Sequence, residues 1–170
     1  MFFDEIEGYK DLFNLIEKVI KPGYTVLDVG CGDGDVLKFL EEEFKIEGVG
    51  IDPFCFYHRV GKNIKCIELS GENIDKIKEK FDIIYSINSL HHLNNHKLFL
   101  DKIKKVLKRK GFLILVDWKK GYDTGVRENY FSLEEIEGEL IRRGIKIVES
   151  GTTVSHWYIL GKNNGGDKAF

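Results

Sequence analysis

The chain has 170 residues, of which 42% are hydrophobic, so it is long enough for one compact domain with a sizeable core. A net charge of −2 gives no overall field that would draw it to nucleic acid or to an anionic membrane. Its longest apolar run, residues 112–116, falls far short of the roughly twenty residues that a membrane-spanning helix needs, so no membrane partner is expected.

Apolar periodicity alternates along the chain between helix-like and strand-like segments, with turn residues at the joints. In chain order we expect a helix at 9–20, a strand at 25–29, a helix at 34–43, a strand at 47–51, a short helix after Pro53, a strand at 64–69, a helix at 72–79, a strand at 81–87, a helix at 95–108 and a strand at 112–118. Strands separated by helices indicate parallel strands joined by right-handed crossovers.

The last part of the chain follows a different pattern. Ser132 and Glu135 have the spacing of a capping box, which predicts a helix over 132–143. A short Ser-Gly-Thr turn then joins strand-like runs at 145–149 and 154–160, and it has too few residues for a parallel crossover. The predicted fold class is therefore α/β, with a doubly wound, mostly parallel seven-stranded sheet and a C-terminal antiparallel hairpin.

Domain limits and compartment follow from composition. One domain is expected over residues 1–161, followed by a disordered tail at 162–170, which lacks an apolar stripe. The chain starts with acidic residues where a secretory signal would be basic. Its three cysteines include no CxxC pair, which argues against a disulfide framework and a zinc ribbon. We therefore expect a cytoplasmic protein with reduced thiols and no metal.

A glycine-rich loop follows the first expected strand, in the stretch VLDVGCGDG. Gly30, Gly32 and Gly34 let the chain turn sharply, approach a ligand and pack against the next helix. Asp28 precedes this loop, and Asp52 ends the second expected strand about twenty residues further on, a distance at which an acid can bind both hydroxyls of a ribose. Because ligands of open parallel sheets bind beyond the carboxyl ends of the strands, these residues predict a site for an adenosine-type cofactor.

The acidic residues beside the loop help to distinguish between possible cofactors. A dinucleotide needs the G-x-G-x-x-G spacing to seat its pyrophosphate at the start of the helix. Here Asp33 and Asp35 lie at that position and would repel phosphates. A cofactor that carries an ammonium and a sulfonium group would be attracted instead, so a nicotinamide-dependent reductase is disfavoured.

At these residues the chain resembles the class I S-adenosylmethionine-dependent methyltransferases. The likeness rests on VLDVGCGDG followed by GVGID, on FDIIYSINSLHHL, on LKRKGFLILVDW and on the closing hairpin, and it extends over about residues 20–161. It implies a Rossmann-like methyltransferase fold, S-adenosylmethionine as the cofactor, and a relationship to the small methyltransferases that act on small molecules.

The resemblance also implies roles for single residues. Asp28, Gly30 and Gly32 would lie against the methionine part of the cofactor, Asp52 would hold the ribose, and Phe54 would lie beside the adenine. Many relatives have an Asp-Ala pair after the third strand, and this chain has Ser70-Gly71 there, followed by Glu72. The cofactor-binding residues expected in full are Asp28, Gly30, Cys31, Gly32, Asp52, Pro53, Ser70, Gly71, Glu72 and Asn88.

A catalytic residue is optional, because aligning the two reactants supplies much of the acceleration in methyl transfer. If an acceptor hydroxyl or thiol must lose a proton, the candidates are His91, His92, Asp117 and Tyr130. His91 and His92 fit a structural role as well. His156, which has apolar neighbours, is expected to be a packing residue with its polar atoms satisfied.

Substrate contacts are expected from segments above the cofactor. Residues 118–131 mix aromatic surface with charge, as a pocket for an amphiphilic molecule would, although an ordinary surface loop fits equally. The residues expected in such a pocket are Asp117, Trp118, Tyr122, Arg127 and Tyr130. Phe2, Phe3 and Tyr9 could close as a lid or belong to a helix that packs on the sheet.

Alternatives to small-molecule methylation remain open. The stretch Asn88-Ser89-Leu90 lacks the Asn-Pro-Pro-aromatic motif of many base and amide N-methyltransferases, which makes that chemistry less expected. The basic run at 102–110 fits the solvated face of a helix better than a phosphate site. An RNA or protein methyltransferase and a non-catalytic S-adenosylmethionine-binding subunit are the other candidate functions. The oligomeric state is not predicted.

Overall fold

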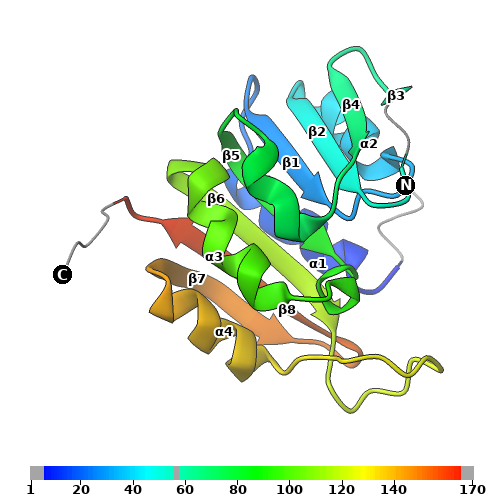
Figure 1. Cartoon of the computed structure of the whole chain (residues 1–170), viewed down its shortest axis with the longest axis vertical. Coiled ribbons are helices and arrows are strands. Elements are labelled where there is room, and N and C mark those ends of the chain that lie inside the picture. The colour runs from blue at the N-terminus through cyan, green and yellow to red at the C-terminus, as the bar shows by residue number, and fades with distance from the viewer. Residues whose placement is uncertain (1–5, 56–57, 166–170) are drawn as a thin grey trace.

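The computed structural model describes residues 6–55 and 58–165, and within them the chain forms one eight-stranded sheet with helices on both faces (Figure 1). The α-helices are α1 (Tyr9–Val19), α2 (Asp35–Phe44), α3 (His96–Val106) and α4 (Leu133–Arg142), and the 3-10 helices are η2 (Gly71–Lys76) and η3 (Leu90–His92). The strands are β1 (Thr25–Val29), β2 (Glu47–Asp52), β3 (His58–Arg59), β4 (Ile64–Glu68), β5 (Phe81–Ile87), β6 (Leu107–Trp118), β7 (Ile145–Thr152) and β8 (His156–Asn163).

The strand order is β3-β4-β2-β1-β5-β6-β8-β7. β1 lies in the middle and pairs in parallel with β2 on one side and β5 on the other. From β1 the next strands in the chain are added on the β2 side, and from β5 onward they are added on the other side. Open α/β sheets bind their ligands at this point, where the strand order reverses. β8 runs antiparallel to both β6 and β7, which confirms the predicted C-terminal hairpin.

Two apolar cores, one on each face, hold the sheet between its helices. On the face toward the viewer in Figure 1, α3, α4 and η2 contribute buried residues such as Phe99, Ile136 and Ile74. On the opposite face, α1 and α2 contribute Leu12 and Leu37. Burial on both faces explains why the central strands are almost continuously apolar. The sheet is thus a rigid base for side chains at its carboxyl edge.

The predicted α/β fold is confirmed, with differences at several element ends. All seven expected strands are present, and the two-residue β3 adds a further edge strand, antiparallel to β4. The segment expected to be a helix at 72–79 is the 3-10 helix η2. After Pro53 the described residues form a turn instead of a helix, and residues 56–57 lie outside the described part.

The junction between α3 and β6 also differs from the prediction. The helix ends at Val106, and Leu107 already pairs with Phe81 of β5. The expected break at Lys110-Gly111 is instead an irregularity inside a long strand, where Lys110 has a φ of 64°. The expected helix at 95–108 is therefore shorter, because tertiary pairing with β5 takes its last residues.

Two features near the C-terminus depend on local chemistry. The Ser132 capping box forms as predicted, with Ser132 Oγ accepting from the Glu135 amide over 3.2 Å. The Ser-Gly-Thr segment expected as the hairpin turn belongs to β7, so the turn lies at residues 153–155. β8 continues to Asn163, two residues past the expected domain end.

Parts of the predictions fall outside the described residues. Phe2 and Phe3, the candidate lid residues, lie outside the described part of the chain, and so does the predicted tail from residue 166 onward. Tyr9 begins α1 and packs against the core on the face of the sheet that α1 and α2 cover, as expected for a helix that packs on the sheet. No helix in the described residues has the length and apolar character to cross a membrane.

Candidate functional site

A cavity of about 590 Å³ opens at the carboxyl ends of β1, β2, β4 and β5. This is the size range of small-molecule and cofactor sites, which is roughly 300–1,000 Å³. The cavity lies beside the point where the strand order reverses, because parallel strands end at one edge of the sheet. Its wall consists of Val29, Gly30, Gly32, Ile51, Asp52, Pro53, Phe54, Leu69, Ser70, Gly71, Glu72, Asn88, Ser89, His92, Leu93 and Asn94.

The glycine loop brings the backbone to the cavity. Gly30 has a φ of 85°, and a side chain there would collide with Ser89. Gly32 has a φ of 54°, and a Cβ built on it would have no atom within 4 Å, so its backbone faces open space. The loop therefore leaves room at Gly32 for a ligand to approach the main chain.

Asp52 ends β2 with its carboxylate at the cavity wall. Oδ2 accepts a hydrogen bond from the Gly32 amide over 3.1 Å, and Oδ1 accepts one from the Phe54 amide over 2.9 Å. Each carboxylate oxygen can accept a further bond, so the group can still take a pair of hydroxyl donors. Phe54 beside it is 92% exposed, so its ring offers an apolar surface that the other described residues leave open.

Asp28 lies in β1 below the loop and is almost fully buried. Tyr85 donates a hydrogen bond to its Oδ2 over 2.8 Å, whereas Oδ1 has no hydrogen-bond partner among the described residues. Burial raises the pKa of Asp28 to about 7, the Tyr85 bond opposes this, and the charge of Asp52 adds to it. A cationic group that reached Asp28 would stabilise its charged form.

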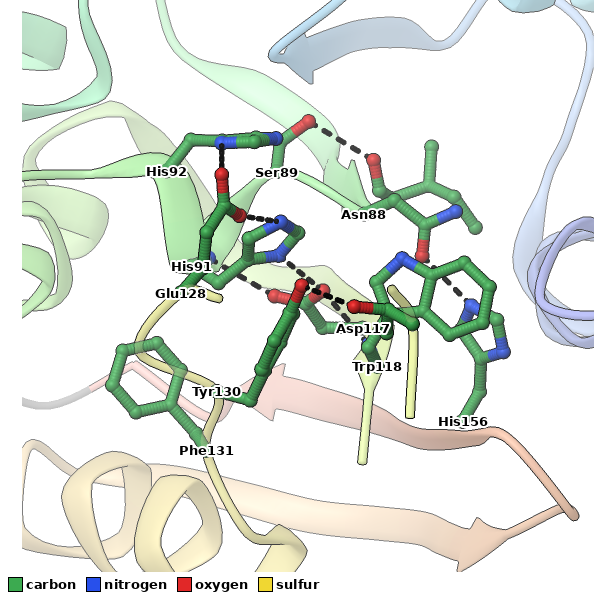
Figure 2. Close-up of polar contacts among 12 residues, drawn as sticks. Asn88, Ser89, His91, His92, Asp117, Trp118, Glu128, Tyr130, Phe131 and His156 are labelled. Atoms are coloured by element: carbon green, nitrogen blue, oxygen red, sulfur yellow. Dashed lines mark hydrogen bonds and ion pairs between the residues drawn. The ribbon is translucent and has the colours of Figure 1, made fainter. Parts of the chain in front are cut away.

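Asn88 follows β5 in a left-handed conformation, with a φ of 52°, and faces the cavity. Its Oδ1 lies 2.8 Å from His156 Nε2 (Figure 2). On the other side of the ring, His156 Nδ1 lies 2.7 Å from Ser155 Oγ. The amide oxygen accepts, so His156 donates from Nε2 and accepts from Ser155. Burial lowers the pKa of His156, which suits this neutral form. His156 is the satisfied buried residue expected, and it orients Asn88.

Behind the cavity, His91 lies between two carboxylates. Its Nδ1 is 2.7 Å from Asp117 Oδ1, and its Nε2 is 2.8 Å from Glu128 Oε2 (Figure 2). Asp117 also accepts the backbone amides of His91 and Trp118. Glu128 reaches His92 Nδ1 over 3.4 Å. Glu128 thus ties the segment after β6 to both histidines.

The loop after β4 forms the remaining wall. Ser70 Oγ accepts a hydrogen bond from Asn73 Nδ2 over 3.1 Å. The Glu72 carboxylate accepts from the Asn95 amide over 3.1 Å, which fixes η2 against the start of α3. A Cβ on Gly71 would lie 3.0 Å from Leu93, so this position is closely packed.

The cavity brings together most of the predicted cofactor residues. Two of them, Asp28 and Cys31, are not in its wall. The Cys31 thiol donates to the Gly32 carbonyl and lies close to Cys66, whose thiol pKa burial raises to about 11. Of the four catalytic candidates, only His92 lines the cavity.

The expected substrate pocket is not part of this cavity. Trp118 stacks on Tyr122, and the Tyr130 hydroxyl lies 2.7 Å from Thr124 Oγ1 within the same segment. The segment is held by these contacts of its own and by contacts with other elements, such as Glu128 with His91 and the Phe131 carbonyl with Trp157 Nε1 over 3.0 Å. In the described residues, none of its side chains lines the 590 Å³ cavity.

Two residues that contribute to the site, Tyr85 and Glu128, have no distinctive signal in the sequence. Tyr85 has the appearance of one more core aromatic in a buried strand, and Glu128 that of a charge in a polar loop. Their importance comes from contacts with Asp28 and His91, which lie 57 and 37 positions away in the chain. Other wall residues, such as Ser89 and Leu93, flank predicted ones and follow from the position of the loops.

Comparisons with known proteins agree with this geometry. A family model described as a methyltransferase domain matches residues 4–150. The chain is 27% identical over 157 residues to phosphoethanolamine N-methyltransferase 3 of Arabidopsis thaliana, which covers 81% of this chain and 31% of that protein. It is 27% identical over 127 residues to the 2-methyl-6-phytyl-1,4-hydroquinone methyltransferase of Synechocystis sp., which covers 66% and 37%.

A solved structure shares the fold. The crystal structure of an S-adenosylmethionine-dependent methyltransferase from Aquifex aeolicus aligns with a TM-score of 0.74 over 95% of this chain and 92% of that chain, at 22% identity. The chain spans about a third of the length of the two curated relatives.

Proposed function

Because this chain belongs to the methyltransferase domain family, of the class I S-adenosylmethionine-dependent type, we propose that it transfers a methyl group from S-adenosylmethionine to a small-molecule acceptor. The family and the cofactor are those predicted from the motifs, and both are confirmed. The observation that carries the proposal is the cavity in which an open glycine backbone at Gly32 and the carboxylate of Asp52 face one space.

The residues present fit the cofactor. Asp52 would accept hydrogen bonds from the ribose hydroxyls, and the open space at Gly32 admits a ligand against the backbone. The exposed ring of Phe54 offers apolar surface to the adenine. Asp28 has one carboxylate oxygen without a partner among the described residues, which suits an ammonium group.

When bound, the cofactor supplies an electrophilic methyl group on a sulfonium. The chain's own task is to align the acceptor with it, and alignment of this kind supplies up to about 7–11 kcal/mol in favourable cases. Asn88, whose Oδ1 accepts a hydrogen bond from His156, would donate a hydrogen bond from its Nδ2 to the molecule that receives the methyl group. His92 would take a proton at Nε2 from an acceptor hydroxyl, because Glu128 faces its Nδ1.

The size of the cavity and the names of the relatives support a small acceptor. The two curated relatives are named for phosphoethanolamine and for a substituted hydroquinone, an amine and a phenol. We infer that the acceptor is a small molecule that carries an amine or a hydroquinone ring. The cytoplasmic location remains a prediction.

Turnover on a panel of acceptors tests the proposal. Purified protein with S-adenosylmethionine is offered small amines, phosphorylated amino alcohols and hydroquinones, and separately total RNA and a protein extract. Formation of S-adenosylhomocysteine together with a methylated small molecule supports the proposal. Methylation of RNA or protein alone contradicts it and favours the macromolecular alternative. Cofactor binding without turnover on any acceptor also contradicts it and favours a non-catalytic subunit.

A further inference from the structure

All three cysteines of the chain meet in one place. Cys31 lies in the glycine loop after β1, Cys55 follows β2, and Cys66 lies within β4. Their sulfur atoms all lie within 4.8 Å of one another. Cys55 and Cys66 are buried, Cys31 is partly exposed, and none of the three is in a disulfide. Three separate segments thus contribute one sulfur atom each to a single cluster.

Two glycines leave the room that the sulfur atoms occupy. A Cβ on Gly50 would lie 2.6 Å from Cys31 Sγ and 3.1 Å from Cys66 Sγ. Gly50 lies inside β2 and has no positive φ, so its backbone does not require glycine. A glycine in a strand interior weakens the strand and often marks a close approach by another group. At Gly34, a Cβ would lie 2.8 Å from Cys66 Sγ.

We propose that Cys31, Cys55 and Cys66 bind a thiophilic metal ion, such as Zn²⁺ or Cu⁺. Zinc–sulfur bonds of about 2.3 Å in tetrahedral geometry place two sulfur atoms about 3.8 Å apart, within the separation found here. Three thiolates select ions of this class, whereas Mg²⁺ and Ca²⁺ require oxygen ligands. The partly exposed Cys31 gives the ion an entry path.

Binding involves no oxidation. Each thiol that binds loses its proton to solvent, the S–H bond breaks, and a metal–sulfur bond forms in its place. With three thiols bound to Zn²⁺, the complex carries one negative charge, and a fourth position stays open for water. The metal and the thiols keep their oxidation states throughout.

The position of the cluster gives it a consequence for the cavity. Cys31 lies between Gly30 and Gly32, and Cys55 is three residues after Asp52. A bound ion would join the glycine loop to the segment after β2 and to β4, and so hold two walls of the cavity together. This inference rests on the sulfur geometry and does not depend on the proposed methyl transfer.

A second set of side chains provides a control. His91, His92 and Glu128 also bring three ligand atoms within 4.8 Å of one another. There, however, the Glu128 carboxylate already pairs with both histidines, so an ion would have to displace these contacts. Metal binding at the cysteines should therefore survive changes at His92 and Glu128.

Metal titration of the full chain tests the proposal. Reduced protein freed of metal is titrated with Zn²⁺, Cu⁺ and Mg²⁺, and Co²⁺ reports thiolate ligands through charge-transfer absorption in the near ultraviolet. The variants are Cys55→Ser and Cys66→Ala, and the double variant His92→Ala/Glu128→Gln is the control. Circular dichroism and thermal melting verify that each variant is folded.

The expected result is one equivalent of Zn²⁺ or Cu⁺ per wild-type chain, with a rise in melting temperature and thiolate absorption with Co²⁺. Each cysteine variant should bind at least about 100-fold more weakly, because even an outer partner of a metal ligand is worth about 10–100-fold. The control variant should bind like the wild type. Binding no tighter than that of Mg²⁺, or binding lost only in the control, would overturn the proposal.

Discussion

The Tyr85 hydroxyl donates a hydrogen bond to Asp28 Oδ2 over 2.8 Å, and both side chains are buried beneath the glycine loop. Burial raises the pKa of Asp28 to about 7, more than the Tyr85 bond lowers it. In the unfolded chain this carboxyl has its ordinary pKa of about 3.9. Between these two values the folded state binds one more proton than the unfolded state, so its stability falls as the pH rises through this window.

The substitution Asp28→Asn should remove this pH dependence. Between pH 5 and pH 8 the free energy of unfolding of the wild type should fall by about 2–3 kcal/mol more than that of the variant. Urea unfolding of both proteins at the two pH values measures the difference. Parallel changes in the two proteins would show that Asp28 does not titrate in this window.

Asp52 should contribute strongly to cofactor affinity. Replacement by Ala removes a pair of charge-assisted hydrogen bonds to the ribose, which is worth on the order of 2–4 kcal/mol, or roughly 30- to 1,000-fold in Kd. Calorimetric titration with S-adenosylmethionine measures this loss. Asp33→Asn is the matched control, since it removes an exposed charge from the same loop. Equal losses in both variants would mean that only the net charge matters.

His156 should make the stability sensitive to mild acid. Burial lowers its pKa, so the unfolded chain takes up a proton near pH 6.5 before the folded chain does, and stability falls as the pH decreases through that range. His156→Gln keeps a donor for Asn88 and should lose this dependence. His156→Leu should in addition cost about 1–3 kcal/mol, because the partly buried Asn88 oxygen loses its donor.

Thermal melting of the three proteins at pH 5 and pH 7.5 distinguishes these contributions. If His156→Leu is as stable as His156→Gln at pH 7.5, the bond to Asn88 does not stabilise the fold.

Glu128 should hold the segment at 119–131 against the histidines. Glu128→Gln weakens the pair with His91, whose side chain is only 4% exposed, and should cost about 1–3 kcal/mol locally. Amide hydrogen exchange in this segment should then speed up by about tenfold or more. Arg127→Ala, at an exposed neighbour, should leave exchange unchanged. Equal exchange in wild type and Glu128→Gln would show that the pair does not restrain the segment.

The features that the sequence predicts correctly are those that depend on a local pattern of residues. Alternating periodicity predicted the sheet, the spacing of Ser132 and Glu135 predicted the start of α4, and the glycines predicted the loop at the cavity. The end of α3 was wrong because pairing of Leu107 with β5 overrides helix propensity. Such competition between local and tertiary preferences is not visible in a single segment.

The sequence pattern does not reveal which residues that are distant in the chain come into contact in the fold. Nothing in the neighbourhood of Cys31, Cys55 or Cys66 indicates that their sulfur atoms meet, because their approach depends on the order of β1, β2 and β4. The same holds for Glu128, which reaches His91 from a polar loop. Such contacts follow from the topology of the sheet and from the path of long loops.

Calorimetric titration of the purified chain with S-adenosylmethionine, and separately with NADH, tests the central claim most directly. The predicted result is micromolar binding of S-adenosylmethionine and no binding of NADH. Asp52 can bind the ribose of the cofactor, whereas Asp35 at the start of α2 would repel the pyrophosphate of NADH. Binding of NADH in preference, or of neither ligand, would contradict the assignment of this cavity.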